Sequence, residues 1–169
     1  ENGRLDVAFG EGGKVAFETS SRGGNYVGGA FIDPAGKLLI ATSHVARMSS
    51  GQDIAVLRLN TDGSLDSFGS NGVATFSTNN TGMEQGHSVG VLPDGSVVVA
   101  GQTSASSSQF VVLKFTSRGI RDTSFGSSGV SRVNFGGYHD EVQDLVVQAD
   151  GKIVMVGTTY INGSPSQIA

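Results

Sequence analysis

The chain has 169 residues, a length that ordinarily forms one domain with its own core. Charged residues make up only 15% of it, against about 25% in an average soluble protein, and its net charge of −4 excludes the basic surface that binds nucleic acid or an anionic membrane. It has no cysteine for a disulfide or thiolate metal site, and no apolar run approaches the roughly 20 residues of a membrane-spanning helix.

A glycine-rich segment occurs three times along the chain. Its copies begin at Gly3, Gly63 and Gly119, which are 60 and 56 residues apart. A period of this length indicates one supersecondary unit per repeat, stacked on its neighbours because no unit can bury its own apolar surface. We therefore expect one structural segment, 1–169, with repeats at approximately 3–62, 63–118 and 119–169.

Short apolar runs recur four times per period, and we label the corresponding strands A to D. In chain order they predict strands at 15–17, 30–32, 38–41, 54–59, 73–76, 89–92, 97–100, 110–115, 130–133, 145–147, 153–156 and 168–169. Most of these runs are β-branched and bounded by Gly, Asp, Asn or Ser, which are strand signals. Because runs A to C are almost continuously apolar, we expect their sheets to be covered on both faces.

Four antiparallel strands per repeat, covered on both faces, describe the blade of a β-propeller. The alternative is a parallel β-helix, although its coils are much shorter than this period. The fold class we predict is therefore all-β, with three propeller repeats per chain.

The two ends of the chain are offset by one strand. The first predicted strand, Val15 to Phe17, is a D strand, and the last run, Ile168–Ala169, is the start of a C strand. Three blades are too few to close a ring, since propellers usually have four or more. We expect either a head-to-tail dimer of six blades, with Val15 and Phe17 pairing beside Ile168 of the other copy, or a longer propeller of which this chain is a part.

The pattern G-x-L-D-x-x-F-G-x-x-G, followed by an apolar run and D-G-K, resembles the delta-60 repeat, a bacterial β-propeller repeat of unassigned function. Repeat two lacks one residue before Phe68, and repeat one has Asp33-Pro-Ala-Gly36 where Asp-Gly is usual. The resemblance covers essentially the whole chain. It implies a multi-bladed propeller on a secreted or surface-attached bacterial protein, and it supplies no catalytic residues.

One end of the predicted blades carries the A–B and C–D turns, where the repeats agree. Asp6, Asp66 and Asp122 recur there, and we expect each to accept backbone N–H bonds in its own turn. We expect the following Phe9, Phe68 and Phe125 to pack between blades. The alternative is a ring of carboxylates that binds calcium, but the dense D-x-D-x-D-G spacing of a calcium loop is missing.

The other end carries the D–A loops (19–25, 77–86, 136–140) and B–C loops (42–52, 102–108, 158–165), where the repeats differ. Binding residues concentrate on loops held by a rigid scaffold, so this is the predicted ligand face. Its candidate residues are Glu84, His87, His139, Asp140 and Tyr160. Counting back eight from each turn glycine places Gly28, His87 and Gln143 on the innermost strands. We therefore expect Glu84, His87, His139 and Asp140 near the channel mouth, either as a His/carboxylate site or as scattered polar residues around a wet channel.

The function that this pattern favours is a non-catalytic binding or scaffold module, secreted or on the bacterial cell surface. The partner is a protein, including another copy of the chain, or a glycan. Without Trp and with only 3 Tyr the chain offers little aromatic platform for a glycan, so a protein is favoured. We expect no cofactor, no resident metal, no nucleic acid and no membrane insertion. The alternative is a propeller hydrolase or lyase with a metal-assisted His/carboxylate site at the channel mouth.

Overall fold

The computed structural model of the chain describes residues 3–17, 26–45, 52–77, 84–104, 108–161 and 166–169. Its regular elements are all β-strands, as the sequence predicts, and the described residues include no helix that could cross a membrane. The strands are β1 (Val27–Ile32), β2 (Leu38–Val45), β3 (Gln52–Leu59), β4 (Val73–Phe76), β5 (Glu84–Val91), β6 (Val97–Ser104), β7 (Ser108–Phe115), β8 (Val130–Val133), β9 (His139–Val147), β10 (Ile153–Tyr160) and β11 (Gln167–Ile168).

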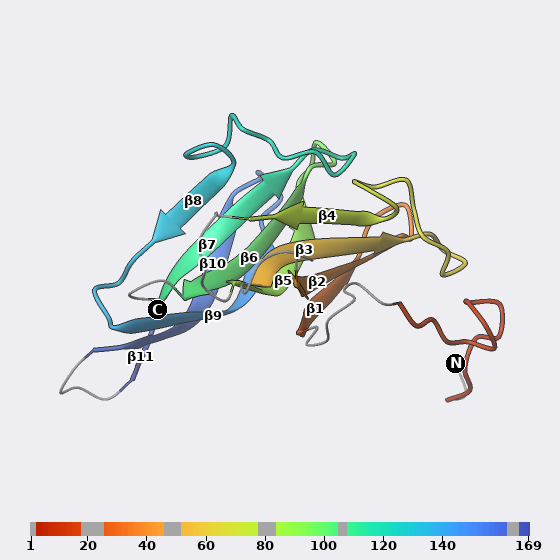
Figure 1. Ribbon diagram of the computed structural model, residues 1–169, viewed down its shortest axis with the longest axis horizontal. Helices are drawn as coiled ribbons and strands as arrows, with labels where there is room; N and C mark the ends of the chain where they lie inside the picture. Colours follow the sequence, from red (N-terminus) through yellow and green to blue (C-terminus); the bar gives the residue numbers. More distant parts are fainter. Residues whose placement is uncertain (1–2, 18–25, 46–51, 78–83, 105–107, 162–165) are drawn as a thin grey trace.

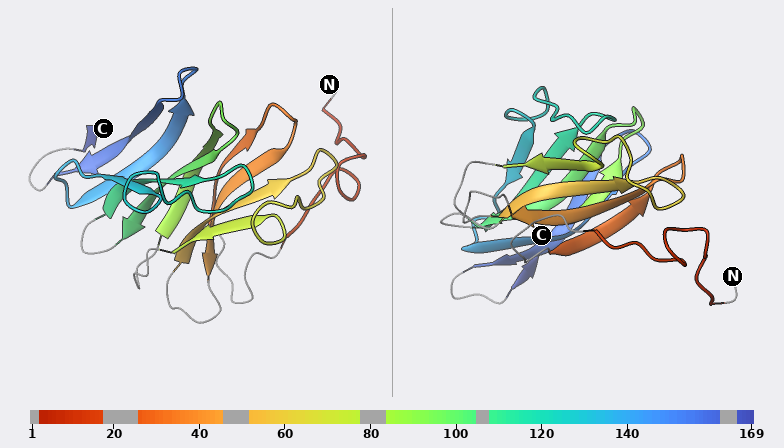
Figure 2. Two further views of the ribbon diagram at one scale, coloured as in Figure 1. Left: turned by 90° about the horizontal axis from the view of Figure 1, so that it is seen from above. Right: turned by 45° about the vertical axis from the view of Figure 1, so that its right-hand side comes forward.

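The strands form three antiparallel groups that follow one another along the chain, and we call them blades 1, 2 and 3. Blade 1 is β1–β4, blade 2 is β5–β8 and blade 3 is β9–β11, each with its strands side by side in chain order. Blades 2 and 3 are joined into one seven-stranded sheet by a single parallel pair, Ser108 and His139. The blades fan out in chain order, with the two termini at opposite ends of the molecule (Figures 1 and 2).

Blade 2 is apolar on both faces because its two central strands are apolar at consecutive positions. Side chains of a strand point alternately to opposite faces. One face, which we call the backward face, packs on blade 1 through Val97, Val99, Val111, Leu113 and Phe115. The forward face packs on blade 3 through Val98, Ala100, Phe110 and Val112. A strand in which apolar residues do not alternate with polar ones therefore indicates a sheet that is covered on both faces.

The same alternation places the core residues of the two outer blades. Blade 1 presents its forward face to blade 2, with Leu39, Ala41, Ile54 and Val56 fully buried there. Blade 3 presents its backward face to blade 2, where Leu145, Ile153 and Met155 lie in the second core. The first strand β5 contacts both β1 and β9, which places strand A of each blade at the narrow side of the fan.

The predicted strands match the observed ones with two differences. Strands A, B and C extend beyond the apolar runs: β3 begins at Gln52, and β2 continues through Thr42 and Ser43 in unbroken register with it. The polar residues of these extensions continue the ladder because pairing uses the backbone. Residues 15–17, predicted as a D strand, pair with no strand of the described residues. A β-strand forms only when its backbone pairs with a neighbouring strand, so the apolar pattern of residues 15–17 is not sufficient to make them a strand.

The segment before residues 15–17 nevertheless adopts the turn that precedes β4 and β8. Gly10, Gly12 and Gly13 have φ values of 59°, 61° and 84°, matched by Gly69, Asn71 and Gly72 at 57°, 50° and 79°. The third repeat has the same series at Gly126, Ser128 and Gly129, with 54°, 53° and 88°. The N-terminal segment is therefore a preformed C–D turn of the same kind as the turns in blades 1 and 2.

Candidate functional site

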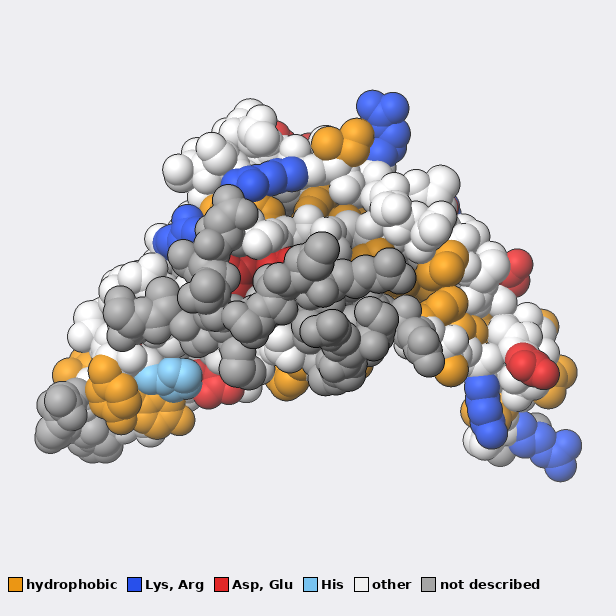
Figure 3. Space-filling view, in the orientation of Figure 1, with side chains coloured by type: hydrophobic (Ala, Val, Ile, Leu, Met, Phe, Trp, Pro, Cys, Tyr) orange, Lys and Arg blue, Asp and Glu red, His pale blue; other side chains and the backbone are white. Residues whose placement is uncertain are grey.

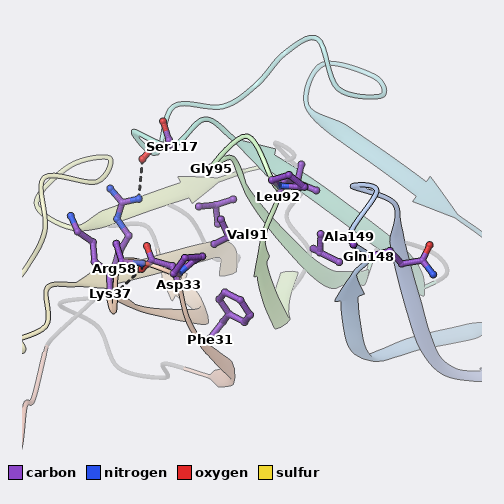
Figure 4. A pocket seen from close by; sticks show the side chains of 15 residues that line it. Phe31, Asp33, Lys37, Arg58, Val91, Leu92, Gly95, Ser117, Gln148 and Ala149 are labelled. Atoms are coloured by element: carbon purple, nitrogen blue, oxygen red, sulfur yellow. Dashed lines mark hydrogen bonds between the residues drawn. The ribbon is translucent and has the colours of Figure 1, made fainter.

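A groove of about 550 Å³ lies where the A–B turns of the three blades meet, and we call it the turn groove. Its apolar lining includes Phe31 and Val91 near the ends of β1 and β5, followed by Leu92 in the second turn and Val147 at the end of β9. Figure 4 shows Phe31, Val91, Leu92 and Ala149 around the opening, with Arg58, Lys37 and Asp33 on the blade 1 side. All three blades thus contribute to one concave surface.

The turns that border the groove have a shared local cause. Asp33 accepts the backbone N–H groups of Ala35 and Lys37 at 2.9 and 2.8 Å, which is an Asx turn. Gly36, Gly95 and Gly151 follow with φ of 79°, 80° and 83°, a conformation that glycine adopts at no steric cost. The three A–B turns therefore share one backbone conformation at this glycine, although their sequences differ between blades.

The charged side of the groove is built around Asp66. Arg58 donates to the Asp66 carboxylate through Nε, and Lys37 Nζ lies 3.2 Å from the other carboxylate oxygen. Arg58 also donates to the carbonyl of Ser117 in blade 2 at 2.9 Å, and its guanidinium lies 4.4 Å from the centre of the Phe68 ring. One carboxylate therefore faces two cations, and because Asp33 lies on the same side of the groove, that side carries charges of both signs.

Burial alone would raise the pKa of Asp66, but the Ser67 N–H, Lys37 and Arg58 outweigh it and lower the pKa below the ordinary value. An Asp with a depressed folded-state pKa contributes stability above its unfolded pKa, and that contribution is lost as pH falls through the folded pKa. We expect Asp66→Asn to lower the free energy of unfolding by about 2 kcal/mol at about pH 7 and to have little effect at about pH 2. Urea denaturation at the two pH values measures this.

Asp122 is the matched control for this prediction, because it occupies the same repeat position and pairs with Lys114 at 3.1 Å. Its side chain is 20% exposed, against 7% for Asp66. Asp122→Asn is therefore expected to cost less than Asp66→Asn. Equal losses for Asp66→Asn at both pH values would show that the ion pair is not the source of the effect.

The repeated Asp residues accept backbone N–H bonds in their own turns as predicted. Phe68 and Phe125 pack in the cores between blades, whereas Phe9 is half-buried and belongs to neither core of the described residues. Ala8, Ser67 and Ser124 each donate their backbone N–H to the Asp of their own turn, at 3.0, 2.7 and 3.1 Å. Phe68 is fully buried, edge-on to Phe115 of blade 2 with 6.5 Å between ring centres. The described residues contain no group of three or more His, Asp or Glu arranged to hold a metal ion.

The sequence-predicted ligand residues divide into two sets. Glu84, His87 and Asp140 are buried in their strands. Asp140 accepts from Thr159 Oγ1 at 2.5 Å and from the Phe135 N–H at 3.0 Å. His139 lies outside, 3.9 Å from the Glu141 carboxylate and with its ring 5.6 Å from that of Tyr160. In the space-filling view a histidine and an acidic side chain lie beside hydrophobic ones over this end of blade 3 (Figure 3).

His87 lies at a backbone irregularity that all three A strands share. The register of β5 with β6 shifts between Gly86 and Ser88, and equivalent shifts occur at Gly28 in β1 and Gln143 in β9. These are the three positions predicted to lie on the innermost strands. A Cβ at Gly28 would lie 2.3 Å from the Gly86 carbonyl oxygen, so the inner strands of blades 1 and 2 are in direct contact there.

The contact at Gly28 removes water from His87. Burial lowers the pKa of His87, and the Glu141 carboxylate opposes the shift. Its Nδ1 lies 3.4 Å from the Tyr26 hydroxyl. The next residue of β5, Ser88, donates a hydrogen bond to the Asp144 carboxylate at 2.6 Å and so links blades 2 and 3. The inner polar residues therefore connect neighbouring blades.

Much of the predicted ligand face lies outside the described residues. These are 19–25 of the first D–A loop, 78–83 of the second, and 46–51, 105–107 and 162–165 of the B–C loops. The turn groove, at the opposite end of the blades, was missed by the sequence analysis. The available signal was the difference between the turn sequences Asp33-Pro-Ala-Gly36, Leu92-Pro-Asp-Gly95 and Gln148-Ala-Asp-Gly151.

The chain matches a protein-family model described as a domain of unknown function (DUF5122) beta-propeller. The match covers residues 34–68, 92–125 and 148–167, together just over half of the chain. The chain belongs to this family. Each matched segment of the DUF5122 propeller begins at an A–B turn of the groove, and the first two end at Phe68 and Phe125. No curated protein and no solved structure matches the chain.

The match establishes the propeller repeat that the resemblance implied, and the delta-60 identity stays a prediction. The antiparallel blades of this DUF5122 propeller stack on one another through their apolar faces, as expected of a propeller repeat.

Proposed function

We propose that this DUF5122 propeller is a non-catalytic binding and scaffold module of a secreted or cell-surface bacterial protein, and that it binds a protein segment in the turn groove. The observation that carries the proposal is the groove itself, a concave surface of about 550 Å³ to which three blades contribute. Ligand sites in proteins are concave, mostly apolar and edged by a few polar groups.

The chemistry of the groove favours a peptide with an apolar side chain and a nearby carboxylate. Phe31 is 38% exposed and offers an apolar surface, while Lys37 on the charged side is 32% exposed and offers an ammonium group to a carboxylate. Phe31 is the one aromatic side chain among the described residues of the lining, so the groove offers little of the aromatic platform on which sugars stack. The weakly charged surface, rich in Ser, Thr and Gly, fits a secreted or surface location.

We expect linear peptides selected from a random phage-displayed library on the immobilised protein to combine apolar and acidic residues. They should bind the Phe31→Asp variant at least about tenfold more weakly than the wild type. The new carboxylate in the groove repels the acidic residue of the peptide, and the apolar contact of Phe31 is lost. Fluorescence anisotropy with the selected peptides measures this.

Tyr138→Asp is the control, since Tyr138 is 61% exposed and lies outside the groove. Peptides that bind wild type and Phe31→Asp equally would contradict the site. Peptides that lose binding only with Tyr138→Asp would move the site to the loop face, and binding to a glycan array without peptide binding would contradict the class of ligand.

A further inference from the structure

The forward face of blade 3 exposes an apolar surface that its counterpart in blade 2 buries. Val154 and Val156 of β10 are 49% and 46% exposed, and Ile168 of β11 is 87% exposed. Their repeat equivalents Val98, Ala100 and Phe110 are at most 1% exposed, because blade 3 covers them. An exposed apolar surface of this kind marks an interaction site.

The backward face of blade 1 is the matching surface. Ile32 is 67% exposed, whereas its equivalents Val91 and Val147 pack against the two cores. Leu38 and Ile40 are half-buried, whereas Val97 and Val99 of blade 2 are 1% and 0% exposed. Within the chain, forward and backward faces pack on each other twice, so the two uncovered faces are the two halves of the same repeated interface.

The N-terminal segment contacts blade 1 as the C–D turn of blade 1 contacts blade 2. Gly10 donates its N–H to the Asp62 carbonyl at 2.8 Å, and Gly69 donates to the Arg118 carbonyl at 2.9 Å. Gly10 and Gly69, and likewise Asp62 and Arg118, are repeat equivalents. Residues 3–17 are thus placed on blade 1 as the turn of a preceding blade would be.

We propose that a second copy of this chain covers these faces, head to tail, with the forward face of blade 3 in one copy against the backward face of blade 1 in the other. In blade 1, Ile54 of β3 pairs with Phe76 of β4. Ile168 is the equivalent of Ile54, and Phe17 is the equivalent of Phe76. The contact therefore brings Phe17 of the second copy opposite Ile168 and completes the open edge of β11.

A heterologous contact of this kind closes into a ring of two copies when the three blades of one chain span half a turn. Two copies supply six blades, within the usual range of four to eight. The inference is independent of the proposed function, because Val154, Val156 and Ile32 lie outside the lining of the turn groove.

Sedimentation velocity of the 169-residue chain over a range of concentrations tests the inference. The expected result is a species of twice the 17.3 kDa monomer mass. Val154→Asp and, separately, Ile32→Lys should each raise the dissociation constant at least about tenfold, because each places a charge in an apolar contact. An equimolar mixture of the two variants should restore the dimer, since one contact is then wild type and the other pairs Asp with Lys.

Ile120→Asp is the control, because Ile120 is 58% exposed in a C–D turn outside both faces, and this variant should dimerise normally. Circular dichroism verifies that each variant is folded, and Val156→Asp replaces Val154→Asp if the latter is not. A wild-type monomer at all concentrations overturns the inference, as does a mass that grows without limit. Loss of the dimer with Val154→Asp but not with Ile32→Lys would indicate a face-to-same-face contact and would also overturn it.

Discussion

Phe68→Ala is expected to lower the free energy of unfolding by about 3–5 kcal/mol, the range for truncating a buried aromatic ring. Phe68 has no exposed surface and lies between blades 1 and 2, edge-on to Phe115 and beneath the Arg58 guanidinium. Its removal leaves a cavity at the blade contact and takes away the aromatic face on which Arg58 rests. Urea denaturation followed by far-UV circular dichroism measures the loss.

Phe125→Ala is the matched control for this prediction. Phe125 is the repeat equivalent of Phe68, but it is only half-buried against the second core. Less apolar surface is lost on truncation, so its cost is expected to be about 1–2 kcal/mol. If the two substitutions cost the same, then burial between blades 1 and 2 is not what sets the contribution of this repeated phenylalanine.

The blades could be predicted from the sequence because their determinants are local and repeated. Runs such as Val97 to Ala100 alternate between two apolar faces, so they report both the strand and its two covered sides. The turn glycines report left-handed backbone, which recurs with nearly equal φ at Gly36, Gly95 and Gly151. Three copies of each signal reinforce one another.

Features that depend on a non-local partner could not be predicted. Val15 to Phe17 has the apolar pattern of a D strand, but no described strand lies in register with it, and strand formation depends on that pairing. The turn groove combines Phe31, Leu92 and Val147, which no local motif links. Its charged side depends on Arg58 reaching Asp66 and the Ser117 carbonyl, a contact set by the stacking of two blades.

The predicted ligand residues show the same limit. Spacing placed Gly28, His87 and Gln143 at equivalent positions, and the structure gives each strand a bulge there. The spacing of these residues from the turn glycines does not indicate which side chains are buried. Asp140 accepts bonds from Thr159 and Phe135 inside its own blade, so its carboxylate serves the packing of blade 3.

The three-blade fan has a middle blade covered on both sides and outer blades that each have one uncovered face. Amide hydrogen exchange at two protein concentrations tests this most directly, because exchange reports the local opening free energy of each strand. Amides of β6 and β7 should be the most protected at both concentrations. In dilute solution the amides of β2 and β10 should exchange at least about tenfold faster than those of β6 and β7. At high protein concentration the exchange of the β2 and β10 amides should slow.

The result that would contradict the account is equal protection of β2, β6 and β10 in dilute solution with no dependence on concentration. That outcome would mean that the outer faces of blades 1 and 3 are already covered within a single chain. Faster exchange in β6 and β7 than in β10 would likewise contradict the central position of blade 2.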